Sequence, residues 1–499
     1  MNFLTFRSRI IALLTILFLG SITYSYGQSA TKPKEQNCYS VLVGKGASYD
    51  GSVMLAHNED DFGDQLFNWI VVPKLAHNKN EKFTTLQGAK IAEPDTTYRY
   101  IWLDMPGMAF SDSYMNENGV TIVSNSCPSR EDKPDLTSGG LTWELRQLMA
   151  QRAKSARHAV KIASQLISEF GYAASGRTYS IADPNEAWML SVVNGKHFVA
   201  LRIPDDHIAV IPNYYTITEV NLSDTANCIA SPDLITYAQN RGWYDPSKQG
   251  FNFREVYGNP DALNHPENIM RMWIGVNSLQ TRQFSPDEPF PWSFRPSDQV
   301  TIEKLSTLLS NHYENTSFDH TNGYQTGNPH ENDPSTVCAT HNQYGFIAQL
   351  RNWMPTDVGC LWWIAPRRPC LQPFTPLYAG LTSFPERFSM YNYKEAIKHH
   401  FDDIESMRAV APNHIYYDFF DLTAYGDSIS YIKTLRKRVS EKDNLFRTYL
   451  KKQEKFELET LALWVRDREA ARKRLTEYSV EGIEKSAASS VETLKSLKK

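Results

Sequence analysis

The stretch "EQNCYSVLVGKGASYDGSVMLAHNEDD", residues 35–61, decides how the first strands of this chain fold. Two alternating, Val-rich runs flank Asp50 and Gly51, a pair that is typical of the turn of a β-hairpin. If the pairing is centred on that turn, Cys38 faces about position 63, and a slip of two or three residues brings it beside Asp60. The pattern therefore predicts a hairpin with a cysteine at one strand head and a group of acids across from it.

Cys38 has two interpretations. A thiol at a mature N-terminus can attack a carbonyl group while the α-amine of the same residue, with an ordinary pKa of about 8, acts as the general base. That chemistry requires removal of every residue before Cys38. A cysteine that starts a strand is otherwise a small buried hydrophobe, and residue chemistry alone favours this structural interpretation.

The acids of the hairpin lie in "HNEDD", residues 57–61. The carboxylate of Asp60 could hold and orient an α-amine at Cys38, and Glu59 or Asp61 could receive the ammonium group of a substrate. A run of acids is, in most proteins, a solvated turn. The segment alone leaves both interpretations open.

Two asparagines end predicted strands: Asn125 in "VTIVSNSCPS" and Asn213 in "AVIPNYYTI". An amide N–H group can donate to the oxyanion of a tetrahedral intermediate. Asparagine at a strand end more often forms a turn, so the turn is favoured when each residue is considered alone.

The N-terminal residues have the order of a secretory signal peptide. Arg7 and Arg9 precede an apolar run over residues 10–20, and small residues follow. We expect residues 1–27 to be the signal peptide and residues 28–37 a short leader. The run is short for a membrane span, although an uncleaved anchor is the alternative. The chain is therefore expected in the periplasm or outside the cell, with no stable membrane insertion after signal cleavage.

Composition excludes some classes of protein. The chain has 499 residues, of which 41% are hydrophobic and 22% charged, and its formal net charge is -4. These values are ordinary for a globular protein with a large core, and they argue against nucleic acid as a partner. Association into a homo-oligomer stays open. No linker or repeat divides the chain, so we expect one catalytic domain over residues 38–390 and a helical C-terminal region over residues 391–499 that packs on it.

Strands and helices are predicted in an α+β order. Helices are expected over residues 142–171 and 298–312, and again from residue 393 onward. The charge-laced C-terminal region carries an apolar stripe through Leu445, Tyr449, Phe456 and Trp464. Beyond the hairpin, strands are expected in "LFNWIVVPKL", "YRYIWLDMP", "GVTIVSNS", "RTYSIADPNEAWMLSVV", "KHFVALRIP", "HIAVIPNYYTI", "YGFIAQLRNWMP" and "GCLWWIAP".

The numbers and positions of cysteine and histidine residues indicate whether disulfide bonds or a metal site are expected. Six cysteines are too few for a disulfide scaffold in so long a chain, and Cys360 with Cys370 is the pair best placed for a bridge, if one exists. The His- and Asp-rich segment over residues 312–341 could hold a metal, but no two of its histidines have the spacing of a zincin helix. A structural loop is favoured, and neither a metal nor an organic cofactor is predicted.

Taken together, these segments resemble peptidase family C69, the dipeptidases of the N-terminal nucleophile (Ntn) hydrolase superfamily, which are related to the secernins and the choloylglycine hydrolases. "CYSVLVGKGASYDGSVMLAHNED" is close to the family's opening C-T-T-[IL]-[LV]-V-G-K-x-A-[ST]-x-D-G-[ST]-x-[MI]-x-A-R-N-E-D. Later segments follow in the family's order, among them "NENGVTIVSNS", "HYENTSFD", "FIAQLRNWMPTDVGCLWWIAPRRP" and "PLYAGLTSFPERF". The resemblance runs from Cys38 to about Phe388.

The resemblance implies a four-layer αββα Ntn-hydrolase sandwich with a helical C-terminal extension. It also implies a thiol protease whose nucleophile, Cys38, is exposed by autocatalytic or assisted loss of the leader. By position, Asp60 matches the acid that contacts the nucleophile's amine in choloylglycine-type relatives. Asn125 and Asn213 match the strand-end asparagines that line the site, Asn125 being the better oxyanion-hole residue.

Two positions depart from the family pattern. His57 replaces the usual Arg of A-R-N-E-D, so a permanent cation becomes a titratable residue whose role need not be retained. Ser191 and Phe198 replace the Glu and Trp of E-T-x-x-G-x-x-W-x-A, which would reshape the substrate pocket rather than the chemistry.

The expected function is therefore that of a secreted cysteine dipeptidase acting on dipeptides. The catalytic residues would be Cys38, Asp60, Asn125 and Asn213, with His57, Glu59 and Asp61 toward the substrate. An N-acyl amide hydrolase of the choloylglycine-hydrolase type is the alternative enzyme. A secreted binding protein that keeps the fold without catalysis is the alternative from another class.

Overall fold

The computed structural model describes residues 38–60, 66–105, 110–389 and 404–499. The described residues all belong to one compact unit. The predicted signal peptide and leader lie outside the described residues, as does Asp61. Among the helices that are described, none combines the length and the apolarity that a bilayer crossing needs.

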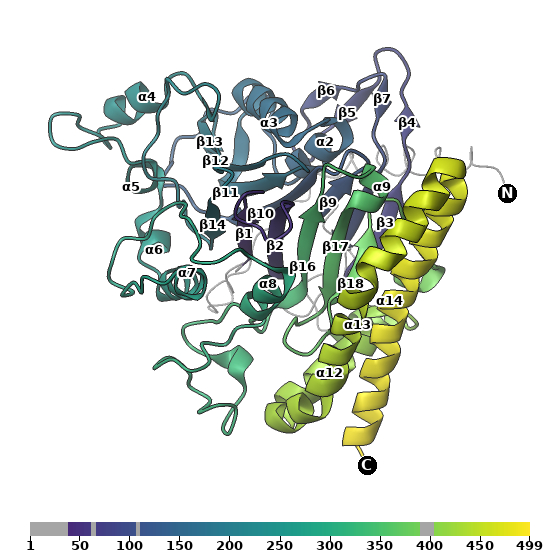
Figure 1. Cartoon of the computed structure of the whole chain (residues 1–499). Helices are drawn as coiled ribbons and strands as arrows, with labels where there is room; N and C mark the ends of the chain where they lie inside the picture. Colours follow the sequence, from purple (N-terminus) through teal and green to yellow (C-terminus); the bar gives the residue numbers. More distant parts are fainter. Residues whose placement is uncertain (1–37, 61–65, 106–109, 390–403) are drawn as a thin grey trace. The chain divides into compact units, whose positions relative to one another are not determined.

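Two large antiparallel sheets form the centre of the fold (Figure 1). In spatial order, the six-stranded sheet contains β14 (Ile208–Ile211), β1 (Tyr39–Val43), β2 (Val53–Asp60), β16 (Asn342–Leu350), β17 (Cys360–Pro366) and β18 (Thr375–Tyr378). The eight-stranded sheet contains β15 (Cys228–Ala230), β13 (Phe198–Arg202), β12 (Ala187–Gly195), β11 (Tyr172–Ala182), β10 (Thr121–Ser126), β9 (Phe110–Asn116), β8 (Tyr100–Met105) and β3 (Asn68–Val72). Two short ladders join β4 (Leu75–Ala76) to β7 (Thr96–Thr97) and β5 (Lys82–Thr84) to β6 (Lys90–Ala92).

Three apolar layers show that the architecture is the predicted αββα sandwich. The inner faces of the two sheets meet in one core that contains Leu55 and Phe346 from the first sheet and Trp69 and Met189 from the second. Helices cover the outer face of the second sheet in another core. Further helices cover the outer face of the first sheet in a third. Strands buried on both faces explain why several runs read as continuously apolar rather than alternating.

The β1–β2 hairpin has a different register from the one centred on Asp50 and Gly51. Tyr39 pairs with Asn58, so the next step along the ladder sets Cys38 opposite Glu59. The loop is asymmetric because its first part bonds elsewhere: the Gly44 N–H donates to the carbonyl of His207 at 2.9 Å. A Cβ on Gly44 would lie 2.4 Å from a backbone oxygen of that neighbouring segment, so only glycine fits there.

The predicted single helix over residues 142–171 is two helices, α2 (Glu144–Arg152) and α3 (Ala156–Phe170). The break occurs because the Ser155 hydroxyl accepts a hydrogen bond from the His158 N–H and so caps the start of α3. The Gly stop is confirmed: Gly171 has a φ of 80°, a conformation that favours glycine, and ends α3.

The segments between β14 and β16 are mainly helical. Thr301 caps α8, which confirms the helix expected over residues 298–312 with narrower bounds. The helices and the 3-10 turn of this region are α4 (Leu234–Asn240), α5 (Phe253–Tyr257), α6 (Pro260–Leu263), α7 (Pro266–Leu279), α8 (Ile302–Leu309) and η1 (Pro329–Glu331). Helix α7 was not predicted, and it carries a residue of the site.

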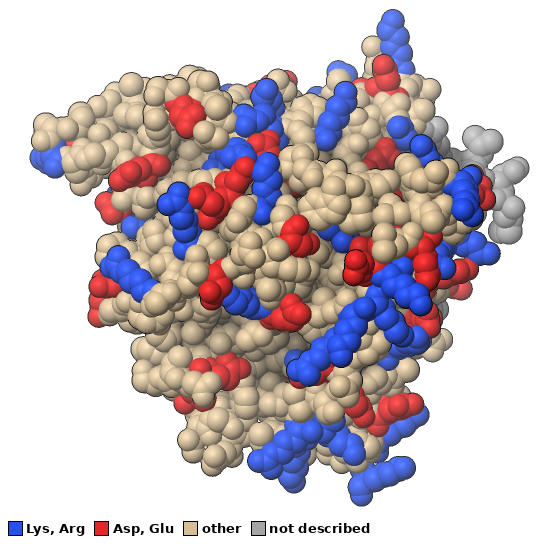
Figure 2. Space-filling view, in the orientation of Figure 1, with Lys and Arg blue, Asp and Glu red and all other residues tan. Residues whose placement is uncertain are grey.

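The C-terminal helices pack on the first sheet, and in Figure 1 the long pair α13 and α14 lies along β17 and β18. The predicted apolar stripe is confirmed: Tyr449 and Phe456 are buried in the core between these helices and the sheet. Figure 2 shows Lys and Arg side chains mixed with Asp and Glu over the visible face. The elements after β16 are α9 (Thr356–Gly359), η2 (Glu386–Phe388), α11 (Ile404–Val410), α12 (Tyr416–Ser428), α13 (Tyr431–Arg466) and α14 (Arg468–Leu497).

All six cysteines lie within the described residues, where each is buried and none forms a disulfide bond. The pair considered for a bridge is separated by the fold. Cys360 lies in the core between the two sheets, whereas Cys370 lies in a small separate cluster with Cys338. A Cys360–Cys370 disulfide is therefore not formed.

Candidate active site

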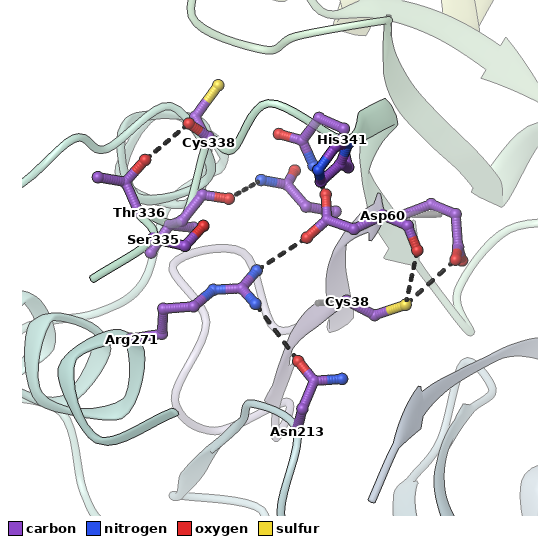
Figure 3. Close-up of polar contacts among 12 residues, drawn as sticks. Cys38, Asp60, Asn213, Arg271, Ser335, Thr336, Cys338 and His341 are labelled. Atoms are coloured by element: carbon purple, nitrogen blue, oxygen red, sulfur yellow. Dashed lines mark hydrogen bonds and ion pairs between the residues drawn. The ribbon is translucent and has the colours of Figure 1, made fainter. Parts of the chain in front are cut away.

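Cys38 lies at the head of β1, buried to 3% exposure, and contacts both neighbouring strands of the first sheet. Its thiol donates to Oε1 of Glu59 at 3.1 Å, and the backbone oxygen of Asp60 lies 3.5 Å from the sulfur (Figure 3). On the other side, Ser40 pairs with Ile211, so continuing the antiparallel register by two residues brings Asn213 beside Cys38. The thiol therefore lies between an acid and an amide.

Asn125 reaches across the sandwich from β10 and fixes the backbone of the nucleophile. Its Nδ2 donates to the carbonyl oxygen of Cys38 at 2.8 Å and to that of Ile211 at 2.9 Å. Both amide protons thus donate to carbonyl oxygens. Since Nδ2 must be the atom that faces these two acceptors, the orientation of the amide is fixed and Oδ1 faces Ser40. Asn125 holds β1 and β14 together at the site.

The fixed amide sets the direction of a buried hydrogen-bond chain. Oδ1 of Asn125 can only accept, so the hydroxyl of Ser40 donates to it at 2.6 Å. Ser40 Oγ then accepts from Nδ1–H of His57 at 2.8 Å. Nε2 of His57 lies 2.8 Å from Oε2 of Glu59, within hydrogen-bond distance. The chain runs from Asn125 to the carboxyl group that accepts the thiol proton.

His57 does not act as a cation in this chain. The side chain is completely buried in β2, and burial, together with the nearby Arg146 and Arg271, lowers its pKa to about 3. The imidazole is therefore neutral at physiological pH. The arginine of the family pattern is replaced by a neutral residue that positions Glu59.

Asp60 ends β2 in a buried ion pair. Nη2 of Arg271, from α7, donates to Oδ2 at 3.0 Å, and the amide of Asn342, at the start of β16, donates to Oδ1. Burial raises the pKa of Asp60 to about 7, while Arg271 and Asn342 act in the opposite direction. The acid is held in place by groups from two distant parts of the chain.

Asn213 has a free donor where Asn125 has none. Its Nδ2 donates one proton to the carbonyl of Ser126 at 3.0 Å, and its Oδ1 accepts from Nη1 of Arg271 at 3.3 Å. Among the described residues, the second amide proton makes no hydrogen bond that would compete with a ligand. Figure 3 shows Asn213 and Asp60 joined through the Arg271 guanidinium on one side of Cys38.

Sequence reasoning missed Ser40, Arg271 and Asn342. A signal existed for Arg271, which is the single charged residue in the apolar run "NIMRMWIGV" of α7. A fully buried cation in such a run requires an acid nearby. No comparable signal marks Ser40 or Asn342, because serine and asparagine at strand positions are common.

The other departures from the family pattern lie in the second sheet. The Ser191 hydroxyl is 3.1 Å from that of Thr178, a buried pair between β11 and β12. Phe198 packs in the outer core between this sheet and α2 and α3. Phe198 therefore contributes to helix packing.

Cys38, His57 and Glu59 also offer three atoms that lie within 4.8 Å of one another, a spacing that a metal ion could bridge. The thiol and the imidazole are, however, each bonded to the same carboxylate, and this satisfies their hydrogen-bonding groups without a cation. The arrangement matches a nucleophile supported by an acid better than a metal centre.

An αββα sandwich with a thiol at the head of a central strand is the arrangement of the Ntn hydrolases. The chain belongs to one family of this class: the sequence model of Peptidase family C69 matches residues 37–423. The protein is accordingly a hydrolase that acts on peptide bonds.

Several relatives are similar over most of their length. A probable dipeptidase from Salmonella dublin is 28% identical over 360 residues, which covers 70% of this chain and 82% of that protein. A dipeptidase from Bifidobacterium longum is 26% identical over 389 residues, covering 70% and 72%. Dipeptidase A from Lactobacillus helveticus is 26% identical over 374 residues, covering 71% and 77%.

Solved structures align more distantly. Penicillin V acylase from Agrobacterium tumefaciens aligns at 12% identity with a TM-score of 0.31, covering 66% of this chain and 82% of that one. A mutant of the conjugated bile acid hydrolase from Clostridium perfringens aligns at 10% identity with a TM-score of 0.30, covering 66% and 89%.

Proposed function

We propose that this protein is an exported dipeptidase that uses Cys38 as an N-terminal nucleophile, after removal of every residue before it. The observation that carries the proposal is the position of the Cys38 thiol, 3.1 Å from Glu59 and opposite Asn213, in a chain whose family match begins at residue 37. The named dipeptidases among its relatives support dipeptides as the substrate class.

In the proposed reaction, the α-amine of mature Cys38 accepts the thiol proton and the sulfur forms a bond with the substrate carbonyl carbon. The protonated amine then donates to the leaving nitrogen as the C–N bond breaks, leaving a thioester on Cys38. Water attacks the thioester, releases the carboxylic acid and restores the thiol. All atoms come from the substrate, the chain and one water molecule.

We assign the oxyanion contact to Asn213 rather than to Asn125. The second amide proton of Asn213 is available beside Cys38, whereas both protons of Asn125 are bonded to backbone carbonyls. Asn125 then acts as a positioning residue that fixes the carbonyl of Cys38. Asp60, held by Arg271, orients the α-ammonium group, whose positive charge would lower the pKa of the acid again.

The acids of β2 supply a reason for selecting a substrate with a free amino group. Glu59 lies at the thiol, and Asp61 follows Asp60 in the sequence although it lies outside the described residues. In this proposal His57 holds Glu59 and does not itself contact the substrate.

Intact mass and activity of wild type, Cys38→Ala and Cys38→Ser test the proposal. The wild-type protein recovered from its native compartment should begin at Cys38 and hydrolyse dipeptides, while Cys38→Ala should be inactive. A mature chain that begins before Cys38, or full hydrolysis of dipeptides by Cys38→Ala, would contradict the proposal.

A substrate panel separates the two enzyme alternatives. Dipeptides with a free amino group should be cleaved, and the same dipeptides carrying an N-acetyl group should be cleaved far less, because the acetyl group removes the charge that the acids would bind. Preference for N-acyl amides would support the choloylglycine-type alternative. A fully processed protein that cleaves neither would support the binding protein.

A further inference from the structure

A second group of reactive side chains lies away from Cys38, in the loop between α8 and β16 and in the turn that follows β17. The sulfur or nitrogen atoms of its four members lie within 4.8 Å of one another, and all four side chains are buried. We call this group the Cys2His2 cluster; it consists of His312, His330, Cys338 and Cys370.

The distances fit a four-coordinate ion. Nε2 of His330 is 3.2 Å from the sulfur of Cys370. Ligand atoms of a tetrahedral zinc site with two sulfur and two nitrogen ligands lie about 3.3 to 3.8 Å apart. The four atoms, all within 4.8 Å of one another, therefore lie close to the spacing that such an ion requires.

Both imidazoles are oriented by carboxylates on their outer nitrogen. Nδ1 of His330 lies 2.8 Å from Oδ1 of Asp427 in α12 and 3.0 Å from Nη1 of Arg368, which itself pairs with Asp427. Nδ1 of His312 lies 3.3 Å from Oε1 of Glu314 and 3.0 Å from the Tyr324 hydroxyl. A metal-binding histidine typically donates its other N–H to such an acceptor, which directs a lone pair toward the metal. This carboxylate–histidine arrangement occurs here twice.

The inner nitrogen of His312 supplies a second, independent observation. His312 is 1% exposed, and its Nε2 makes no hydrogen bond of regular geometry with a described residue, the Cys370 thiol being the group it interacts with. A buried imidazole nitrogen without a regular hydrogen bond is costly. A cation bound between the two histidines and the two thiols would satisfy it.

The surroundings of the cluster are those of a closed site. Tyr431, Leu371 and the two cysteines form a small apolar core of their own. The Tyr431 ring packs edge-on against His312 and His330, with centroids 5.7 and 5.2 Å away. Four buried protein ligands leave no position for a substrate, which is typical of a structural rather than a catalytic zinc site.

We propose that the Cys2His2 cluster binds one zinc ion that fastens the loop over residues 310–341 to the body of the protein. Two thiolates and two imidazoles in tetrahedral arrangement favour zinc among the common divalent metals. The loop contains little regular structure beyond η1, and loops of this length without secondary structure are uncommon in a compact domain. Cys370, in the turn after β17, and Asp427, in α12, would connect the loop to two parts of the chain outside it.

The proposed ion would support the active site without entering the reaction. Figure 3 shows Ser335, Thr336 and Cys338 on one stretch of the loop, in the same region as Arg271 and Asp60. The Val337 carbonyl in that stretch accepts from the Asn58 amide at 2.9 Å. Fixing Cys338 therefore fixes a neighbour of β2, while the thiol chemistry at Cys38 stays independent of the metal.

Metal content of the full chain, purified without chelators or metal-binding tags, tests the proposal. Elemental analysis should give about one zinc per chain. Blocking thiols with a mercurial should release that zinc to a colorimetric indicator. Replacing zinc with cobalt(II) should give the visible absorption of a tetrahedral site together with thiolate-to-cobalt charge transfer.

Variants identify the ligands. Cys338→Ser and His312→Gln should lose the zinc, and Asp427→Asn should weaken zinc binding by about 10- to 100-fold while leaving all four ligands in place. Cys228→Ser is the matched control, because it removes a buried thiol in β15, outside the Cys2His2 cluster, and should retain full zinc. If a ligand variant fails to fold, the zinc content of the wild-type protein still tests the proposal.

Two results would overturn the proposal. One is wild-type protein with reduced Cys338 and Cys370 that holds no zinc after incubation with the ion. The other is a Cys338–Cys370 disulfide in a non-reducing peptide map of protein recovered from its native compartment.

Discussion

At the scale of single residues, the surroundings of the Cys38 thiol follow from the register of two ladders. Pairing of Tyr39 with Asn58 places Glu59 at the sulfur, and pairing of Ser40 with Ile211 places Asn213 on the other side. A shift by one residue in either ladder would turn these side chains to the opposite face of the sheet. The site is thus encoded in strand pairing as much as in residue identity.

Asn213→Ala should lower kcat for dipeptide hydrolysis by about 10²- to 10³-fold, with a smaller change in KM, because it removes a donor that acts on the oxyanion in the transition state. Steady-state kinetics on the processed protein measure this. Circular dichroism should show an unchanged fold. A kcat near that of wild type would remove Asn213 from the oxyanion role.

Ser40→Ala interrupts the chain between Asn125 and His57, leaving a buried acceptor and a buried N–H without partners. We expect a loss of about 1–3 kcal/mol in the free energy of unfolding and a roughly tenfold lower kcat. Ser180→Ala is the control, since the buried Ser180 hydroxyl makes no hydrogen bond to a described residue. Equal effects in the two variants would show that the chain does not support the nucleophile.

At the scale of elements, the helical pair α13–α14 completes the outer layer of the first sheet. The stacked rings of Phe456 and Tyr478, 3.7 Å between centroids, join the two helices over Tyr378 of β18. One buried ion pair fixes the same interface: Arg351, after β16, makes two hydrogen bonds of 2.6 and 2.7 Å to Glu457 of α13. Apolar packing holds the two helices against the first sheet, and the ion pair fixes the position of α13 along it.

Glu457→Gln leaves the Arg351 guanidinium buried without its counter-charge. We expect a loss of about 3–5 kcal/mol in the free energy of unfolding, measured by urea denaturation. Glu459→Gln, which breaks a surface pair with Arg474, should cost about 1 kcal/mol or less. Similar losses in both variants would contradict a special role for the buried pair.

The elements also show how far the sequence could predict the structure. The hairpin, most central strands and the C-terminal helices follow from local periodicity, which is a property of neighbouring residues. The register of the hairpin was wrong because the bonds of Gly44 to a distant segment set it, and the break at Ser155 was missed because the apolar pattern continues across it. Asp60 could be proposed from its motif, but its partner Arg271 is 211 positions away.

At the scale of the whole molecule, buried neutral histidines make the fold sensitive to acid. Burial is the main cause that lowers the pKa of both His57 and His414 to about 3. His414, just before α12, accepts from the Tyr416 N–H at its Nδ1 and donates from Nε2 to Asn68 in β3. Protonation would break the first of these bonds, so the contact between the C-terminal helices and the second sheet depends on a neutral ring.

The pH dependence of stability follows from these pKa values. Histidine in the unfolded chain has a pKa of about 6.5. Between pH 6.5 and pH 3 it is therefore protonated in the unfolded chain, whereas His414 in the folded protein stays neutral. The contribution of His414 is therefore complete above pH 6.5 and decreases as pH falls toward 3, by about 2 kcal/mol at pH 5. His414→Gln should lose less stability than wild type between pH 7 and pH 5 in urea denaturation, and His320→Gln, at an exposed position, is the control. An unchanged pH slope in His414→Gln would contradict the prediction.

All contacts described for Cys38 involve its own carbonyl and sulfur, and their partners are residues later in the chain. Cutting the bond before Cys38 would break none of them. In the proposed maturation the cut would act as a switch in charge, creating an ammonium group beside the buried acids Glu59 and Asp60. The onset of activity would then depend on when that single bond is broken, and the time of cleavage rather than the time of folding would set when the enzyme begins to work.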